Sequence, residues 1–343
     1  MFNTIYRKIH IGWSIVIAVK VTLQLLLRNV LDKKIVVIGL VEHFGDIIAF
    51  EPLIARIIKE YPNRKILWVM RTPFAIIAKN DSRIDTIYKI PCLTSWIFIT
   101  YFFKKLHSSI PVLDAHVSGK SCEKCNWLYH IISGNATTQP LHGLNYFFED
   151  RNLLSVFAYQ LNMLPIADTP PQFFFDEHVN SIKTKFSLPE KYLVIHCTSE
   201  NNNKHWTIKS WTKLVSYLGK NTNYMIIEIG LKSAIVTNEK KYFSLCGKTN
   251  ILEMAAIIRR SDLFIGIDSG PAHIANATNV PSLILMGRLN NFEHYNPFSG
   301  IRNKKHFVLL DASPLACREL PVNSVIAALQ QHQFLSFNNS IDE

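Results

Sequence analysis

Cysteine is scarce in this chain, with six residues among 343. Six scattered thiols do not form a dense disulfide framework, so we expect a reducing, cytoplasmic compartment. Acidic residues are also few, with 26 Asp and Glu against 37 Lys and Arg, which gives a formal net charge of +11. This excess predicts an anionic partner: a nucleic acid, an anionic membrane surface or a phosphorylated substrate. Nucleic acid has only the charge in its favour, and we expect no nucleic-acid partner.

Repeats, low-complexity segments and the common nucleotide-binding fingerprints are missing as well. The first strand-to-helix turn, between Gly39 and Gly45, has neither the G-x-G-x-x-G pattern nor a G-K-[ST] ending. These absences exclude a dinucleotide fingerprint and a P-loop there. Cys122 and Cys125 form a lone C-x-x-C motif. A structural zinc would need two more ligands at a comparable spacing, and none is found nearby, so we expect no metal site.

The chain is long enough for two domains, and its hydrophobic content of 48% supplies ample core. The Pro-rich run 164–171 (LPIADTPP) is typical of a linker. We therefore predict domains at 33–165 and 172–320. An apolar helix at 1–32 precedes them, and a helix and tail at 321–343 follow.

The apolar run 9–31 has the length of a membrane span. Lys20, Gln24 and Arg28 mark one polar stripe on it, and Lys20 near its centre disfavours a span. No small-residue cleavage site follows, so a signal peptide is not expected. Three alternatives stay open: a helix in the membrane interface on the cytoplasmic face of the inner membrane, a helix packed on the domain, and a true span.

The first half begins as a Rossmann-type unit. Lys33–Val41 is an apolar strand that leads into a turn and a helical pattern, and strands are expected at 64–70 and 81–90. Asp46 stands at the turn, at the carboxyl edge of the sheet, where ligand crevices form. The alternative role for Asp46 is a helix cap. Between 92 and 145 the pattern weakens, and we expect helices and loops with an apolar, cationic surface.

The second half repeats the alternation. A strand at 192–196 closes on Thr198 and Ser199, a helix follows from about 207 to 218, and a strand is expected at 224–229. A helix at 251–261 then leads to a strand at 263–267. The pattern predicts a second doubly wound parallel sheet. Two such sheets in one chain suggest a cleft between them.

The stretch 263–287 is the most informative part of the chain. Its strand ends in Asp268-Ser269-Gly270-Pro271, a helix should run from Pro271 to Asn279, and a second strand follows. The start of such a helix presents free backbone N–H groups and is suited to phosphate. His273 should lie one turn in, near the same mouth. The plainer alternative is an ordinary crossover in which Asp268 and Ser269 only cap the helix.

The segment 247–287 resembles the signature region of the heptosyltransferase family of glycosyltransferases (family 9). Val37–Tyr61 resembles the amino-terminal motif of that family, and Lys204-His205-Trp206 resembles its donor loop. The likeness extends from about 33 to 330 and is thin between 92 and 185. It implies a GT-B fold, in which two Rossmann-like α/β domains face each other across a cleft.

The resemblance also implies a function. It is the inverting, metal-independent transfer of a sugar, typically heptose from ADP-heptose, to the lipopolysaccharide inner core or another anionic, lipid-linked surface glycan. The absence of an Asp-x-Asp pair is compatible with metal independence, and no cofactor is expected beyond the nucleotide-sugar co-substrate. The catalytic base of the family falls on Asp46. The donor-binding residues carried over are Thr198, Ser199, Lys204, Thr249, Asp268, Ser269, Gly270 and His273.

Physical roles follow from the chemistry. A departing nucleoside diphosphate gains negative charge, which the Ser269 and Gly270 N–H groups, the helix dipole and the Lys204 ammonium can stabilise. The plainer alternatives are a solvated loop lysine at Lys204 and a packing histidine at His273. A non-catalytic nucleotide-sugar or glycan-binding protein on the same scaffold also stays open, as does a different donor nucleotide sugar.

One departure from the family pattern puts the nucleotide in doubt. Family members often carry a ribose-binding Glu a few residues after the glycine that matches Gly230, where this chain has Ala234. Glu228 and Glu239 are the nearest carboxylates, and we predict a ribose-binding role for neither.

Overall fold

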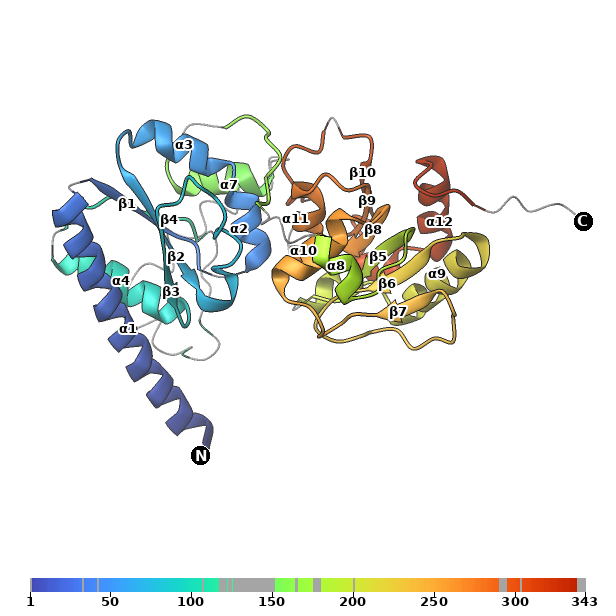
Figure 1. Ribbon diagram of the computed structural model, residues 1–343, viewed down its shortest axis with the longest axis horizontal. Helices are drawn as coiled ribbons and strands as arrows, with labels where there is room; N and C mark the ends of the chain where they lie inside the picture. Colours follow the sequence, from blue (N-terminus) through green and yellow to red (C-terminus); the bar gives the residue numbers. More distant parts are fainter. Residues whose placement is uncertain are drawn as a thin grey trace, which may run out of the picture. The chain divides into compact units, whose positions relative to one another are not determined.

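The computed structural model describes residues 2–32, 34–41, 43–106, 108–116, 122, 125, 152–163, 166–174, 180–199, 201–289, 295–302 and 304–337. The chain forms two compact units, 1–169 and 170–343, which divide within the predicted linker. Each unit holds one parallel β-sheet with helices packed on it (Figure 1). The predicted α/β class with two Rossmann-like units is confirmed. The cleft expected between them stays a prediction.

The first unit is built on a four-stranded parallel sheet in the order β3-β2-β1-β4. Its strands are β1 Ile35–Gly39, β2 Lys65–Arg71, β3 Thr86–Ile90 and β4 Val112–Asp114. All five residues of β1 are buried, as expected for a central parallel strand covered on both faces. Alternate β1 side chains, Ile35 and Val37, pack with the helices on one face. On the other face, Trp68 of β2 packs against Phe50.

The helices α2 Phe44–Phe50, α3 Leu53–Glu60 and α7 Leu153–Gln160 belong to this unit. The helical pattern expected after the first strand runs through 47–62 in the sequence. The structure breaks it in two, because Pro52 lacks a backbone N–H and clashes with a preceding turn. Phe50 of α2 contacts Phe157 of α7, with ring centroids 5.5 Å apart, so α2 and α7 lie on the same face of the sheet. Most of the stretch 92–145 beyond β4 lies outside the described residues, and its predicted surface is untested.

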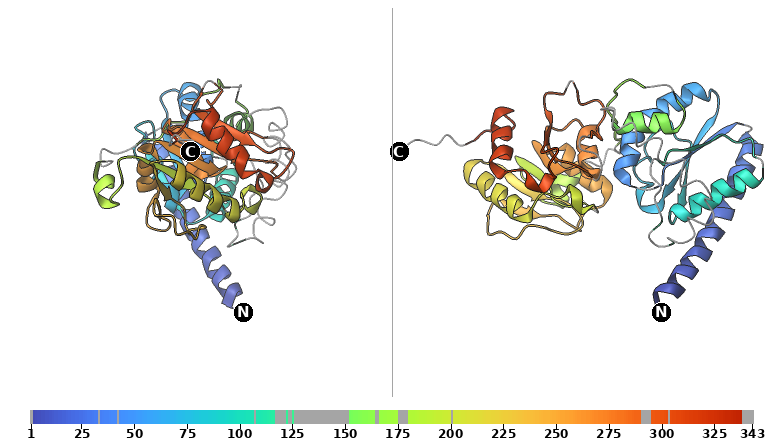
Figure 2. Two further views of the ribbon diagram at one scale, coloured as in Figure 1. Left: turned by 90° about the vertical axis from the view of Figure 1, so that its right-hand side faces the viewer. Right: turned by 180° about the vertical axis from the view of Figure 1, so that it is seen from behind.

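The amino-terminal helix α1 (Phe2–Asp32) packs on α4 (Leu93–Lys105), as two views show (Figures 1 and 2). Its buried side chains recur every three or four residues, at Ile11, Ser14, Ala18, Val21 and Leu25. The packed-helix alternative is therefore correct for this face. The opposite face exposes large apolar side chains, namely Ile9, Trp13, Val16, Leu23 and Leu27. By length and composition α1 is the one described helix able to cross a membrane, and a third of its most apolar window is buried.

One contact between β1 and α4 leaves no room for a side chain. A Cβ atom added at Gly39, the last residue of β1, would lie 1.9 Å from the indole ring of Trp96. Trp96 is 1% exposed, so it has little space to retreat. The Trp96 ring therefore packs directly against the backbone of β1.

The second unit is built on a six-stranded parallel sheet in the order β10-β9-β8-β5-β6-β7. The strands, in chain order, are β5 Tyr192–His196, β6 Met225–Glu228, β7 Tyr242–Ser244, β8 Leu263–Ile267, β9 Ser282–Met286 and β10 Phe307–Asp311. The chain adds strands outward from β5 on one side and then returns to β8 on the other. The order therefore reverses between β5 and β8, and this topological switch point is where open α/β sheets bind ligands.

Helices cover both faces of this sheet. Side chains of α9 (Ile208–Asn221) and α12 (Val322–Gln331) share one apolar cluster with β5, β8 and β9. Helices α10 (Ile251–Arg259) and α11 (Gly270–Ala277) pack against each other, and α11 packs on β8 and β9. Asn279 adopts φ 58° just past α11, as predicted for a left-handed helix end. The short helix α8 (Asn180–Lys185) precedes β5 and contacts α10.

Candidate functional site

The candidate site of the second unit lies at the carboxyl ends of β5 and β8. Thr198 and Ser199 follow β5, and Asp268 and Ser269 follow β8. Neighbouring parallel strands end at the same edge of the sheet, so these loops meet at the switch point. The sequence pattern predicted both strands and both loops, and the pairing of β5 with β8 brings them together.

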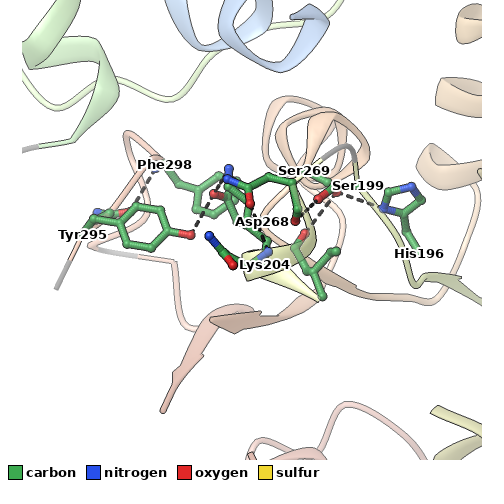
Figure 3. Close-up of polar contacts among 11 residues, drawn as sticks. His196, Ser199, Lys204, Asp268, Ser269, Tyr295 and Phe298 are labelled. Atoms are coloured by element: carbon green, nitrogen blue, oxygen red, sulfur yellow. Dashed lines mark hydrogen bonds and ion pairs between the residues drawn. The ribbon is translucent and has the colours of Figure 1, made fainter. Parts of the chain in front are cut away.

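Lys204 and Asp268 form an ion pair at this edge (Figure 3). The Lys204 ammonium nitrogen lies 2.5 Å from Oδ2 of Asp268, and the Tyr295 hydroxyl donates to the same oxygen at 2.9 Å. Asp268 is 3% exposed, and a buried carboxylate needs such donors. Burial and the neighbouring Asp268 carboxylate raise the pKa of Tyr295 well above its usual value, so this phenol stays a donor. Lys204 is therefore held in place and is not a solvated loop lysine.

Ser269 occupies the residue before α11 but does not cap the helix. Its hydroxyl lies 3.0 Å from the carbonyl oxygen of Ile267 and 3.0 Å from Nδ1 of His196 (Figure 3). A carbonyl only accepts, so the hydroxyl donates to Ile267 and His196 donates from Nδ1. The alternative in which Ser269 serves only as a cap is wrong. The Ser269 side chain therefore does not occupy the backbone N–H groups at the start of α11, which can bind an anion.

His196 ends β5 and is a site residue that the sequence pattern did not predict. Burial, and to a smaller extent the electrostatic effect of the nearby His205 ring, lower the pKa of His196 to about 4. The ring is therefore neutral at neutral pH, in agreement with its Nδ1 donation to Ser269. The only available signal was its place at the end of a buried strand, which does not distinguish it from a packing residue.

Hydrogen bonds of Ser199, His205 and Trp206 hold the donor loop that carries Lys204. Nε2 of His205 lies 2.9 Å from the backbone nitrogen and 2.8 Å from the carbonyl oxygen of Ser199. The indole N–H of Trp206 donates to the Leu320 carbonyl at 2.7 Å, just before α12. Lys204 itself ends a short 3-10 helix, Asn202–Lys204. These contacts hold the loop that carries the Lys204 ammonium.

The remaining predicted donor residues lie at the same edge. Gly270 and His273 are in the first turn of α11, where the ring of His273 packs against Phe298 with centroids 4.7 Å apart. Thr249 stands in the loop after β7, just before the capping box that starts α10. That loop is tied to the loop after β6 by the Gly247 N–H, which donates to the Gly230 carbonyl at 2.8 Å. Thr249 is therefore two strands away from the Lys204–Asp268 pair.

Glu228 is buried at the end of β6 and occupied by protein groups. Its carboxylate accepts from the Ser233 hydroxyl, from the Tyr242 hydroxyl at 2.5 Å and from the Ala234 N–H at 2.8 Å. Glu228 thus shapes the loop in which the family pattern places its ribose-binding Glu.

Asp46 belongs to the first unit and lies in the first turn of α2, after the carboxyl end of β1. The strand order of this sheet reverses between β1 and β4, so the same edge is a switch point here too. The backbone N–H of Val41 donates to Nε2 of His116 at 3.0 Å, and Nδ1 of His116 lies 2.6 Å from Asp114 at the end of β4. Asp46 follows Val41 by five residues in the sequence and is half-buried.

The two extra ligands that the Cys122–Cys125 motif lacked in the sequence are present in the fold. Side chains of His10 and Cys92 lie against those of Cys122 and Cys125. The expectation that no further ligand is nearby was wrong, because 30 and 112 residues of chain separate partners that tertiary packing joins.

Residues 151–321 match the sequence model of glycosyltransferase family 9 (heptosyltransferase). The matched region contains β5, the donor loop and the Asp268–His273 corner. The chain belongs to glycosyltransferase family 9. The family resemblance of the sequence is confirmed.

Curated relatives agree with this assignment. Lipopolysaccharide heptosyltransferase 3 of Escherichia coli K12 is 30% identical over 109 residues, which cover 29% of this chain and 32% of the relative. The chain thus spans about a third of the length of that relative. Lipopolysaccharide heptosyltransferase 1 of Campylobacter coli is 24% identical over 304 residues, covering 73% of this chain and 83% of the relative.

Among solved structures, the E. coli ADP-heptose lipopolysaccharide heptosyltransferase II aligns with a TM-score of 0.63 at 16% identity. The alignment covers 87% of this family 9 chain and 98% of that chain. At this identity the likeness establishes the fold, which is GT-B.

Proposed function

We propose that this family 9 protein is an inverting glycosyltransferase that moves heptose from ADP-heptose to a lipopolysaccharide-type acceptor, without a metal ion in the reaction. Family membership and the names of the curated relatives support the reaction class. The observation that carries the proposal is the Lys204–Asp268 ion pair, fixed at the start of α11 at the switch point of the second unit.

The donor chemistry follows from that corner. The diphosphate of the nucleotide sugar gains negative charge as its bond to the anomeric carbon breaks. The Lys204 ammonium, the backbone N–H groups of Ser269 and Gly270 and the positive end of the α11 dipole would stabilise it. Asp268 holds the ammonium in position, and His196 holds the Ser269 side chain away from the helix start. Preorganised groups of this kind need no rearrangement when the charge develops.

The acceptor chemistry is assigned to Asp46. In a single displacement the acceptor hydroxyl oxygen attacks the anomeric carbon while the bond to the diphosphate breaks, which inverts that carbon. The hydroxyl proton passes to the Asp46 carboxylate, and the diphosphate leaves with the electron pair of the broken bond.

We further propose that the protein acts on the cytoplasmic face of the inner membrane, where a lipid-linked acceptor is held. The outward face of α1 supports this, because it exposes large apolar side chains while the inward face is packed on α4. The net charge of +11 suits an anionic membrane surface and an anionic glycan.

The test replaces Asp46 by Asn and measures heptose transfer and donor binding separately. Transfer should fall by about 10²–10⁴, the usual contribution of a general base, with the Kd for ADP-heptose unchanged. Glu60→Gln is the control, since Glu60 pairs with Arg56 on the surface of α3. Unchanged transfer in Asp46→Asn removes the assigned base.

A binding panel of ADP-, GDP- and UDP-sugars on the wild-type protein tests the donor. We expect ADP-heptose to bind most tightly. A wild-type protein that binds a nucleotide sugar but transfers nothing would be the non-catalytic binding protein instead. If no nucleotide sugar binds better than inorganic phosphate, the transferase proposal fails.

A further inference from the structure

Four metal-ligating side chains converge in the first unit, apart from the residues assigned to glycosyl transfer. They are His10 on α1, Cys92 just before α4, and Cys122 and Cys125 on a short turn. One ligand atom from each lies within 4.8 Å of all the others. The three cysteines are buried, and all four residues lie outside the region 151–321 that matches the family model.

His10 supplies a second, independent observation. Its Nε2 atom is buried and has no hydrogen-bond partner within the described part of the chain. Buried polar nitrogens almost always have a partner, so an unpartnered nitrogen on a ring that lies beside three thiols needs a reason. A neutral imidazole nitrogen with a free lone pair is a metal ligand.

Hydrogen bonds already hold the four candidate ligands close to one another. The Cys125 N–H donates to the Cys122 carbonyl at 2.9 Å, which closes a tight turn and presents two thiols together. Ser14, one turn after His10, donates to the His10 carbonyl at 2.8 Å, and its hydroxyl lies 3.3 Å from the Cys92 sulfur. The ligands thus come from three segments already held against one another.

The spacing suits a single ion. Tetrahedral zinc with Zn–S bonds of about 2.3 Å places its sulfurs about 3.8 Å apart. The observed limit of 4.8 Å requires a contraction of about 1 Å or less. Three sulfurs and one imidazole nitrogen form the Cys₃His set of structural zinc sites, and soft thiolates with imidazole favour zinc over the oxygen-seeking cations.

We propose that His10, Cys92, Cys122 and Cys125 bind one structural zinc ion that fastens α1 and the 122–125 turn to the start of α4. All four positions are filled by protein, so the site has no open position for substrate and plays no part in glycosyl transfer. The ion would add a cross-link where α1 begins its packed region, at Ile11.

The first experiment measures the zinc content of the purified protein. The full-length protein is produced with zinc in the medium, passed through metal-free reducing buffer and analysed by elemental mass spectrometry. We expect about one zinc per chain. Zinc should be lost from the Cys122→Ser/Cys125→Ser variant and retained by Cys246→Ser, which changes a half-buried cysteine of the second unit.

A second measurement on the unmodified protein is independent of variant folding. Metal-free protein is titrated with cobalt(II), which absorbs visible light strongly when tetrahedrally bound by thiolates. We expect one equivalent to produce these bands, zinc to abolish them, and chelation to lower the Tm of the zinc form.

Three results would overturn the proposal. The first is a wild-type protein without zinc or a cobalt spectrum under reducing conditions. The second is a disulfide between Cys122 and Cys125 in the purified protein, and the third is zinc that stays at full stoichiometry in the double variant. None of these readouts depends on heptose transfer, so failure here leaves the proposed function intact.

Discussion

The side chain of Lys204 is directed by that of Asp268, whose Oδ2 atom accepts from both the Lys204 ammonium at 2.5 Å and the Tyr295 hydroxyl at 2.9 Å. The carboxylate is almost fully buried, whereas Lys204 is 23% exposed. The lysine is therefore the more accessible member of the pair. Asp268 is a positioning residue in this arrangement.

Replacing Lys204 by Ala should lower the rate of heptose transfer by about 10²–10³, because one group that stabilises the departing diphosphate is removed. The free energy of unfolding should also fall, by about 1–3 kcal/mol, since a buried carboxylate loses a donor. Lys209→Ala is the control, an exposed lysine at the start of α9. Initial rates with ADP-heptose and urea denaturation measure the two effects. Equal rates for both variants would contradict the role of Lys204.

The buried His196 should make stability depend on pH. Its pKa is about 4 in the folded protein, below the ordinary value of 6.5, so only the unfolded state gains its proton in between. The contribution is fully present above pH 6.5 and is lost as the pH falls toward 4. It amounts to about 3 kcal/mol at most. The amide of His196→Asn can still donate to Ser269 but does not titrate. This part of the pH dependence of the unfolding free energy should therefore disappear in that variant.

Urea denaturation of both proteins at several pH values between 4 and 7 checks this. Other titrating groups contribute equally to the two proteins, so the difference between the curves isolates His196. Parallel curves over this range would show that the ring is not buried as a neutral group.

The two neighbouring tryptophans of the second unit should respond differently to the same change. Trp206 donates to the Leu320 carbonyl, whereas the buried indole nitrogen of Trp211 has no partner among the described residues. Trp206→Phe should therefore cost about 1–2 kcal/mol more than Trp211→Phe, because it also strands a buried carbonyl. Denaturant midpoints give the comparison. Trp206→Phe should in addition weaken donor binding through the Lys204 loop, and equal costs would mean that the hydrogen bond contributes nothing.

The outward face of α1 should bind membranes. We expect the wild-type protein to float with vesicles that contain anionic lipid. The vesicle-bound fraction of Trp13→Gln/Leu23→Gln/Leu27→Gln should be lower by about tenfold or more. These three side chains are more than half exposed, so the change leaves the packed face intact. Leu231→Gln/Val236→Gln is the control, with apolar residues exposed on the second unit. Equal flotation of all three proteins would refute the membrane contact.

Much of the central architecture could be predicted from the sequence, because buried parallel strands are continuous apolar runs. The strand Tyr192–His196 was predicted to the residue, and the corner Asp268–Gly270 was placed correctly between strand and helix. The strand β10 was missed, as were the two short strands β4 and β7. Val112–Asp114 and Tyr242–Ser244 span only three residues each, too few for a periodic pattern to emerge.

Side-chain partners across long sequence distances could not be predicted. Tyr295 follows a segment without periodicity, and only tertiary packing brings its hydroxyl to Asp268. Tertiary packing likewise brings His10 and Cys92 to Cys122 and Cys125, so this cluster could not be predicted from local patterns. Local patterns fix which elements form, whereas these meetings depend on how the elements pack.

The close contact between Gly39 and the Trp96 ring should constrain how these two positions change during evolution. Any larger residue at 39 would displace the indole, and a smaller residue at 96 would leave a hole above the strand. Across descendants of this chain, the two positions should change together or not at all.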